Sequence, residues 1–227
     1  MKLSATTLKY LAIIAMTLDH IAYGFIPSDS IAYNIMRFIG RITAPIMTYF
    51  IVEGFRHTQD RKKYLTRMVC FACLAQFPYL LLFPSAANFN ILFGFCLVLI
   101  VLIAFEFKHF TLIDKILLTT VCFIASLFVE YQCYTLIWGL IFYIFKNKGL
   151  TTQIMMFAVW IVSALIGLYL FNNNFNFYQT GILLTIPLLS FYNGKRGGGN
   201  SFINKWVFYG FYPLHMLILS LIKNLIN

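Results

Sequence analysis

Residues 91–105 have the sequence ILFGFCLVLIVLIAF, a run that contains no charged side chain. An apolar stretch that approaches 20 residues is long enough to cross the hydrocarbon core of a bilayer as a helix. The wider stretch Phe89–Phe107 is therefore predicted to be a transmembrane helix.

The rest of the chain has the same character. Of 227 residues, 61% are hydrophobic and 11% are charged, and the mean hydropathy is +0.81. A soluble domain carries about 25% charged residues, so the composition excludes a soluble globular protein. Polar or turn-forming breaks divide the chain into nine apolar stretches. They predict one all-α domain over residues 1–227, a polytopic bundle of about nine transmembrane helices: Thr7–Ile26, Ile31–Phe55, Met68–Phe83, Phe89–Phe107, Leu112–Val129, Tyr131–Phe145, Thr151–Phe171, Phe177–Tyr192 and Ile203–Ile222.

The distribution of charge predicts the orientation. The net charge of +10 could indicate nucleic-acid binding, but the Lys and Arg residues gather in alternate breaks. This is the positive-inside pattern of a membrane protein with a cytoplasmic N-terminus. The loops around Asp29, Asn88 and Glu130 contain no basic residue and are predicted to be external. We expect a multi-pass membrane protein with no nucleic-acid partner.

Cysteine chemistry is not predicted to be important. Cys70 and Cys73 form a Cys-x-x-Cys pair inside a predicted span. Two thiols supply only half of a tetrahedral zinc site, and cysteines also serve as small apolar residues. No metal site and no disulfide framework are predicted.

Ionisable residues inside the predicted spans are the candidates for function, because a charge at the bilayer centre costs at least about 2.5 kcal/mol on insertion scales. At about 1.5 Å per residue, three of them should each lie about 15 to 18 Å into the membrane. That depth is near the middle of a core about 30 Å thick, so three distant segments are predicted to meet in one polar site. The three are His20, Arg41 and His215, and the others are Asp19, Arg37 and Glu53.

Asp19 is predicted to pair with the second apolar stretch. Arg37 and Arg41 are spaced i and i+4, so they share one helix face that can receive the Asp19 carboxylate. The pair could simply lock two helices together, but with His20 and His215 nearby a functional site is favoured. Glu53 is expected to meet the basic loop that follows it.

Basic residues mark the predicted cytoplasmic side. Lys9 lies eleven residues before His20, on the same helix face. The loop with Lys62, Lys63 and Arg67 suits either anionic lipid or a phosphate-bearing cytosolic ligand.

Several blocks of sequence resemble the TraX family, in the same order along the chain. The main ones are MTLDHIAY at 16–23, RFIGRITAP at 37–45, EGFRHT at 53–58 and FYGFYPLH at 208–215. The resemblance implies an enzyme of the bacterial inner membrane that acetylates the N-terminus of conjugative pilin. The spacing of Lys9 and His20 is also similar to the signature of the wider membrane acyltransferase-3 group, which moves acyl units from cytosolic donors to extracytoplasmic acceptors.

The resemblance implies acetyl-CoA as the donor, and it suggests a role for each candidate residue. His20 would be the general base, Arg41 or His215 would stabilise the oxyanion, and Asp19 would hold Arg41. Both direct transfer and an acetyl-histidine intermediate are open. Arg37 and Glu53 would support the site, and the coenzyme A phosphates would bind Lys9, Lys62, Lys63 and Arg67.

The chain departs from the family at Glu130-Tyr131-Gln132, where relatives often carry Asp-Tyr-Gly. This external position is expected to touch the acceptor, which could be a pilin N-terminus, another exported peptide or a surface glycan. Two other classes of protein are open. One is a proton-coupled transporter with Asp19, His20 and His215 as its relay, and the other is a non-catalytic membrane subunit of a conjugation or secretion apparatus.

Overall fold

The structure is a computed structural model that describes residues 2–84, 88–145, 154–155, 157–159, 161, 176–198 and 201–226. In these ranges the chain forms helices and no strand, apart from isolated backbone bridges that join Leu3 to Tyr192 and Phe89 to Val129. The all-α prediction is confirmed for this part of the chain. Most of the predicted stretch Thr151–Phe171 lies outside the described residues.

The chain divides into two compact units. The first unit comprises Met1–Met47 and Ile144–Lys205, and the second comprises Thr48–Tyr143 and Trp206–Asn227. Each unit is formed by segments that are distant in sequence. The prediction of a single domain stays a prediction.

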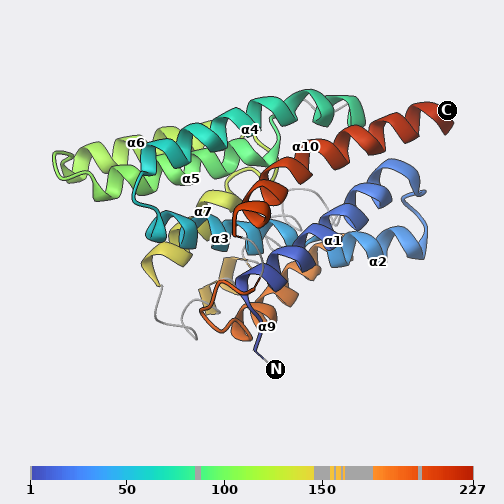
Figure 1. The fold of residues 1–227 in the computed structure, drawn as a ribbon, viewed down its shortest axis with the longest axis horizontal. Coiled ribbons are helices and arrows are strands. Elements are labelled where there is room, and N and C mark those ends of the chain that lie inside the picture. The colour runs from blue at the N-terminus through green and yellow to red at the C-terminus, as the bar shows by residue number, and fades with distance from the viewer. Residues whose placement is uncertain are drawn as a thin grey trace. The chain divides into compact units, whose positions relative to one another are not determined.

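The first unit is built around a helical hairpin. Helix α1 (Ala5–Phe25) and helix α2 (Ile31–Gly40) lie side by side (Figure 1). Ser4 and Ser30 start the two helices, because each hydroxyl accepts a hydrogen bond from a backbone N–H of the first turn. The 3-10 helix η1 (Phe177–Leu184) packs against α2 and continues into α9 (Thr185–Ser190).

The segment after α9 covers the beginning of α1. The N–H groups of Ala5 and Thr6 donate to the carbonyls of Lys195 and Arg196, at 2.9 and 3.0 Å. The first N–H groups of a helix have no acceptor within the helix, so the segment satisfies them. It thereby holds two basic residues at the same end of α1 as Lys9.

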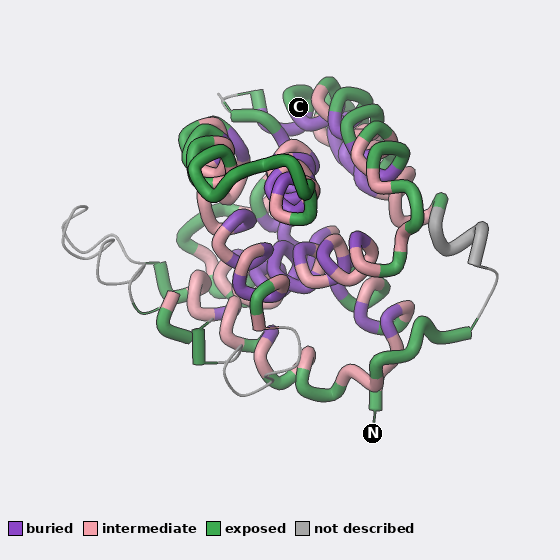
Figure 2. Tube along the Cα trace, turned by 90° about the vertical axis from the view of Figure 1, so that its left-hand side faces the viewer, coloured by how far each residue is buried: buried purple, intermediate pink, exposed green. Residues whose placement is uncertain are grey.

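The second unit contains α4 (Arg61–Leu82), α5 (Ile91–Glu106), α6 (Leu112–Ser126), α7 (Tyr134–Ile144) and most of α10 (Ser201–Ile226). Helices α4, α5 and α6 lie one beside the next (Figure 1). Helices α5 and α7 are buried or intermediate over almost their whole length, whereas α4 and α6 carry exposed residues throughout; Figure 2 colours buried residues purple and exposed ones green. The largest side chains of its core include Trp138, Phe142 and Leu102. The cap of α6 is a capping box, in which Thr111 and Asp114 bond to each other's backbone N–H.

The second predicted stretch, Ile31–Phe55, does not form one continuous helix. Helix α2 ends at Gly40, Arg41 is its C-cap, and helix α3 spans Thr43–His57. Pro45 explains the interruption, because proline has no N–H to donate to the carbonyl four residues earlier and its ring clashes with that carbonyl. The residue four positions before Pro45 is Arg41, so the proline places the break at a candidate site residue.

Three helical segments in the described part of the chain are long and apolar enough to cross a membrane. They are Ile31–His57, in which α2 and α3 are taken together, Arg61–Leu82 and Trp206–Ile226. Shorter apolar helices cover Ile91–Glu106, Tyr134–Ile144 and Phe177–Ser190. These segments indicate a membrane protein, and the count of nine transmembrane helices stays a prediction.

Candidate functional site

The polar centre of the first unit is Asp19 on α1. Its carboxylate accepts from Nη1 of Arg37 at 2.6 Å and from Nη2 of Arg41 at 2.7 Å, and the Asp19 residue is only 5% exposed. The predicted pairing of Asp19 with both arginines is confirmed. Hydrogen bonds between ionised groups are short and strong, so Asp19 fixes the direction of both guanidinium groups.

Local sequence explains how close the two helices come at this point. A Cβ atom built at Gly40 would collide with the Asp19 side chain, so only glycine allows this approach of α2 to α1. The spacing of Arg37 and Arg41 then brings both side chains to the same carboxylate. The hydroxyl of Thr43 donates to the Ala12 carbonyl at 3.0 Å and attaches the start of α3 to α1.

His20 and Lys9 are the other candidates on α1. His20 is buried, with 5% of its surface exposed, and it directly follows Asp19. Lys9 is half-buried near the N-terminal end of the helix, where the positive charge of Arg196 acts on it. The first unit thus contains a buried imidazole on the residue that follows the ion-paired Asp19, and a basic region toward the start of the same helix.

Three tyrosines surround Arg37, and sequence reasoning assigned none of them a role. The centroids of the Tyr23, Tyr33 and Tyr178 rings lie 5.2, 5.8 and 5.2 Å from the guanidinium carbon of Arg37. Tyr178 also lies 5.8 Å from the corresponding atom of Arg41. Such cation–π contacts stabilise a guanidinium group without neutralising its charge.

Helix η1 carries Tyr178 to this position. Phe177 stacks on Phe38 of α2, with ring centroids 5.9 Å apart. A Cβ atom at Gly181 would collide with the backbone carbonyl of Phe38, so glycine is required for this contact. Tyr23 and Tyr33 lie close in sequence to the arginines, on the same helical hairpin, so their contact with Arg37 could have been predicted. Tyr178 is distant in sequence, and nothing in the sequence indicated its contact.

Within the described residues, the ion pairs of this cluster join two cations to one carboxylate. Two guanidinium groups face the single carboxylate of Asp19. Tyrosine rings offer a negative face but no net charge. The cluster is therefore suited to an additional negative charge, such as the one that develops on an oxygen atom in a transition state.

His215 lies in the second unit, on α10. Its Nδ1 bonds to the carbonyl of Phe211 at 2.8 Å, the Phe211 ring stacks on it, and Tyr212 meets it edge-on with centroids 5.6 Å apart. A carbonyl can only accept, so Nδ1 carries the proton and Nε2 of the neutral ring is an acceptor. The predicted meeting of His215 with His20 and Arg41 stays a prediction.

The predicted phosphate-binding residues differ in their surroundings. Lys62 and Lys63 are exposed in the first turn of α4, which Asp60 caps through the Lys63 N–H. Arg67 is half-buried between aromatic rings, 5.6 Å from the Tyr64 centroid and 5.2 Å from that of Tyr209. The prediction that all three bind phosphate groups stays a prediction. A depression of about 310 Å³ opens beside the lysines, lined by Gln59, Asp60, Arg61, Lys62, Ile103, Glu106 and Phe107.

Glu53 belongs to a charged network of the second unit. It lies 3.5 Å from Arg56 and 3.1 Å from His57, which confirms that it meets the start of the basic loop. Arg56 in turn donates to the carbonyls of Phe142 and Tyr143 at the C-terminal end of α7. A cation is favourable at that end of a helix, so the position of Glu53 indicates a structural role.

Comparison with known proteins decides the family. A family model described as TraX protein matches residues 4–223. The chain belongs to the TraX family. The TraX match includes every candidate residue, from Lys9 to His215, and it confirms the resemblance inferred from the sequence.

Two curated proteins are similar to this TraX chain over most of their length. A probable fimbrial assembly protein FimC, serogroup H1, of Dichelobacter nodosus is 31% identical over 243 residues, which cover 97% of this chain and 96% of the relative. An uncharacterized protein of Rickettsia prowazekii is 27% identical over 205 residues, or 81% of this chain and 74% of that protein. No solved structure matches.

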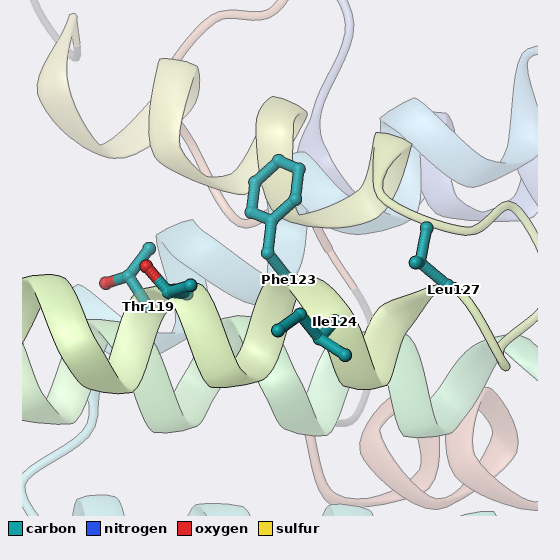
Figure 3. A pocket seen from close by; sticks show the side chains of 5 residues that line it. Thr119, Phe123, Ile124 and Leu127 are labelled. Atoms are coloured by element: carbon teal, nitrogen blue, oxygen red, sulfur yellow. The ribbon is translucent and has the colours of Figure 1, made fainter.

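Other features of the TraX chain carry none of the candidate residues. Within the described residues, no group of three His, Cys, Asp or Glu side chains could hold a metal ion. Cys70 and Cys73 are free thiols on the exposed side of α4. An open depression of about 400 Å³ lies along α6, which supplies its lining side chains together with the C-cap residue Leu127 (Figure 3): Thr119, Thr120, Phe123, Ile124 and Leu127.

Proposed function

We propose that this TraX protein is a membrane-embedded acetyltransferase that moves an acetyl group from cytosolic acetyl-CoA to an acceptor outside the bacterial cytoplasmic membrane. The main support is the buried cluster of the first unit, in which Asp19 binds Arg37 and Arg41, together with the buried His20 that follows Asp19 in α1. The family and the name of the Dichelobacter nodosus relative connect the chain with pilus assembly. A titratable imidazole next to excess positive charge is what acyl transfer needs.

In this proposal His20 is the general base. The acceptor amine or hydroxyl attacks the thioester carbonyl carbon and gives its proton to His20. The bond from carbon to sulfur then breaks, and the coenzyme A thiolate leaves and takes up the proton. The net reaction moves the acetyl unit from coenzyme A to the acceptor and one proton from the acceptor to the coenzyme A thiolate.

Arg41 is the better choice for stabilising the oxyanion. Its guanidinium group is always protonated, and Asp19 fixes its orientation. His215 uses its Nδ1 proton on the Phe211 carbonyl, so in its neutral form its other nitrogen offers a lone pair and not a donor. Arg37 would help to hold the Asp19 carboxylate in place, and Asp19 in turn orients Arg41 toward the oxyanion.

In this proposal basic residues bind the donor. Lys9 is accompanied by Lys195 and Arg196 at the beginning of α1, and Lys62 and Lys63 begin α4. Lysine and arginine suit the phosphate groups of coenzyme A. The acceptor is a pilin N-terminus, another exported peptide or a surface glycan.

A proton-coupled transporter is the second candidate, and the break between α2 and α3 favours it. Transporters often form their sites from interrupted helices, and this interruption includes Arg41, the partner of Asp19. Flux of a solute through proteoliposomes without acetyl-CoA would support the transporter.

The deciding experiment is acetyl-CoA binding by the detergent-purified protein. Lys9→Ala should weaken binding about ten- to a hundredfold, because a charged contact is worth about 1.5 to 3 kcal/mol. His20→Ala should leave binding nearly unchanged and lower turnover by about 10²- to 10⁴-fold, the usual contribution of a general base. Lys223→Ala, a lysine on the predicted external side, is the control.

Absence of acetyl-CoA binding in a folded protein would overturn the proposal. Retained turnover in His20→Ala would remove His20 from its assigned role. If neither variant changed pilus function in cells, the protein would be a non-catalytic subunit of the assembly apparatus.

A further inference from the structure

The depression beside Lys62 lies between the start of α4 and the end of α5, and both helices belong to the second unit. Its volume is about 310 Å³. Pockets that hold small molecules measure about 300 to 1,000 Å³, so the depression has room for a small polar group. Its lining mixes charged and apolar side chains: Gln59, Asp60, Arg61, Lys62, Ile103, Glu106 and Phe107.

One wall of the depression is an ion pair that other side chains hold in place. Arg61 of α4 pairs with Glu106 of α5. The guanidinium carbon of Arg61 lies 4.6 Å from the centroid of the Phe55 ring, and Glu106 accepts a hydrogen bond from the Tyr143 hydroxyl at 3.2 Å. Because both charged groups are already fixed, this wall does not have to be ordered when a ligand binds.

The rim of the depression carries two groups of opposite charge. Asp60 caps α4 through Oδ1, which accepts the N–H of Lys63 at 2.8 Å. With the described residues, Oδ2 of Asp60 and Nζ of Lys62 make no hydrogen bond or ion pair, and both residues are exposed. A ligand that enters the depression therefore meets a carboxylate and an ammonium group on adjacent residues.

Apolar side chains connect the depression with the exposed side of α6. Ile103 and Phe107 line it, and the Phe107 ring packs edge-on against Phe110 with centroids 5.0 Å apart. Leu112 and Ile113, which begin α6, are 73% and 68% exposed. Exposed apolar patches mark membrane contacts, and the charge pattern predicts that this end lies at the cytoplasmic boundary. The depression is thus placed where lipid head groups are expected.

We propose that the depression binds the head group of a phospholipid that carries both a phosphate and a primary ammonium group, as phosphoethanolamine does. Lys62 binds the phosphate and Asp60 binds the ammonium, because hydrogen bonds between ionised groups are strong. The acyl chains lie along Phe107 and the start of α6. Sites for anionic lipids are basic, whereas this lining contains two carboxylates and two cations, so it favours a head group with both charges.

Lys62 is shared between this lipid site and the proposed donor site. A lipid phosphate on Lys62 leaves the donor to Lys9 and to Lys63, which does not line the depression. Binding of the lipid requires no acetyl transfer, so the two assignments can be tested apart.

The test is lipid binding by the full-length protein, delipidated in detergent and titrated by native mass spectrometry. The probes are phosphatidylethanolamine, phosphatidylcholine and phosphatidylglycerol with identical acyl chains. Phosphatidylcholine keeps the phosphate, but its methylated nitrogen has no N–H to donate, and phosphatidylglycerol has no cation. We expect the wild type to bind phosphatidylethanolamine at least about tenfold more tightly than either of the others.

Asp60→Asn removes the charge and keeps the cap of α4, because asparagine caps helices as well as aspartate does. It should reduce the preference for phosphatidylethanolamine to about twofold or less. Asp114→Asn is the matched control, because it makes the same change at an exposed carboxylate in the first turn of α6, outside the depression. It should keep the full preference.

Lys62→Gln tests the phosphate contact and serves as the second variant if Asp60→Asn does not fold. It should weaken binding of all three lipids about tenfold, because all three carry the phosphate. Lys63→Gln, which removes the neighbouring exposed lysine, should leave the three affinities within about twofold of the wild type.

Equal affinity of the wild type for the three lipids, tightest binding of phosphatidylglycerol, or an unchanged preference in Asp60→Asn would overturn the lipid site. Displacement of bound phosphatidylethanolamine by coenzyme A would assign Lys62 to the donor and also overturn it, while the acetyltransferase proposal would stand. If the lipid preference depends on Asp60 and the protein does not bind acetyl-CoA, the lipid site stands and the acetyltransferase proposal falls.

Discussion

Asp19 is the residue on which most of the polar structure depends. It is a buried carboxylate that holds two arginines, so its removal would leave two guanidinium groups without their counter-ion. Breaking a buried ion pair by removing one partner costs about 3 to 5 kcal/mol. We therefore expect Asp19→Asn to lower the free energy of unfolding by about this amount and to abolish activity.

Asp29→Asn is the matched control for this prediction, because Asp29 is exposed in the turn between α1 and α2. The same chemical change there should alter stability by less than about 0.5 kcal/mol. Thermal unfolding of both variants in detergent would measure the difference. Equal stability of Asp19→Asn and wild type would mean that the cluster contributes little to the fold.

At the scale of elements, the contact of η1 with α2 places Tyr178 over both arginines. Gly181→Ala should separate the two helices, because the new methyl group collides with the Phe38 backbone. Overpacking of this kind costs about 1 to 3 kcal/mol, and turnover should fall as Tyr178 leaves its position.

Gly198→Ala serves as the control for Gly181→Ala, since no atom lies within 4 Å of the position its Cβ would take. Activity assays together with thermal unfolding would compare the two variants. A loss of the same size in both would show that the η1 contact has no special importance.

At the scale of the whole molecule, the charge pattern predicts which ends face the cytoplasm. We expect Asp29→Cys, made in a variant without native cysteines, to react with a membrane-impermeant maleimide in intact cells. Lys62→Cys and Lys108→Cys should react only after permeabilisation, because basic loops remain in the cytoplasm. Labelling of Lys62→Cys in intact cells would reverse the predicted orientation.

Much of this protein could be predicted from local features of its sequence. Hydropathy and the spacing of charges are sufficient to predict a membrane protein, because the insertion of each apolar stretch into lipid depends on the composition of that stretch alone. The pairing of Asp19 with Arg37 and Arg41 was also accessible, since helical periodicity places i and i+4 on one face and a short turn joins the two helices. The break at Arg41 could have been found from Pro45, but the apolar run around the proline favoured one long helix.

Other features were decided by the tertiary structure alone. Tyr178 meets the arginines, Arg67 turns inward against Tyr209, and Tyr212 orients Glu130, and each contact joins segments that are far apart in sequence. Periodicity gives the face of a helix on which a residue lies, but not which distant helix packs against that face. Packing of whole side chains makes that choice. The sequence by itself therefore determined that the chain lies in a membrane, that it belongs to the TraX family and that two neighbouring helices are joined by an ion pair. Only the folded chain determined what surrounds that ion pair.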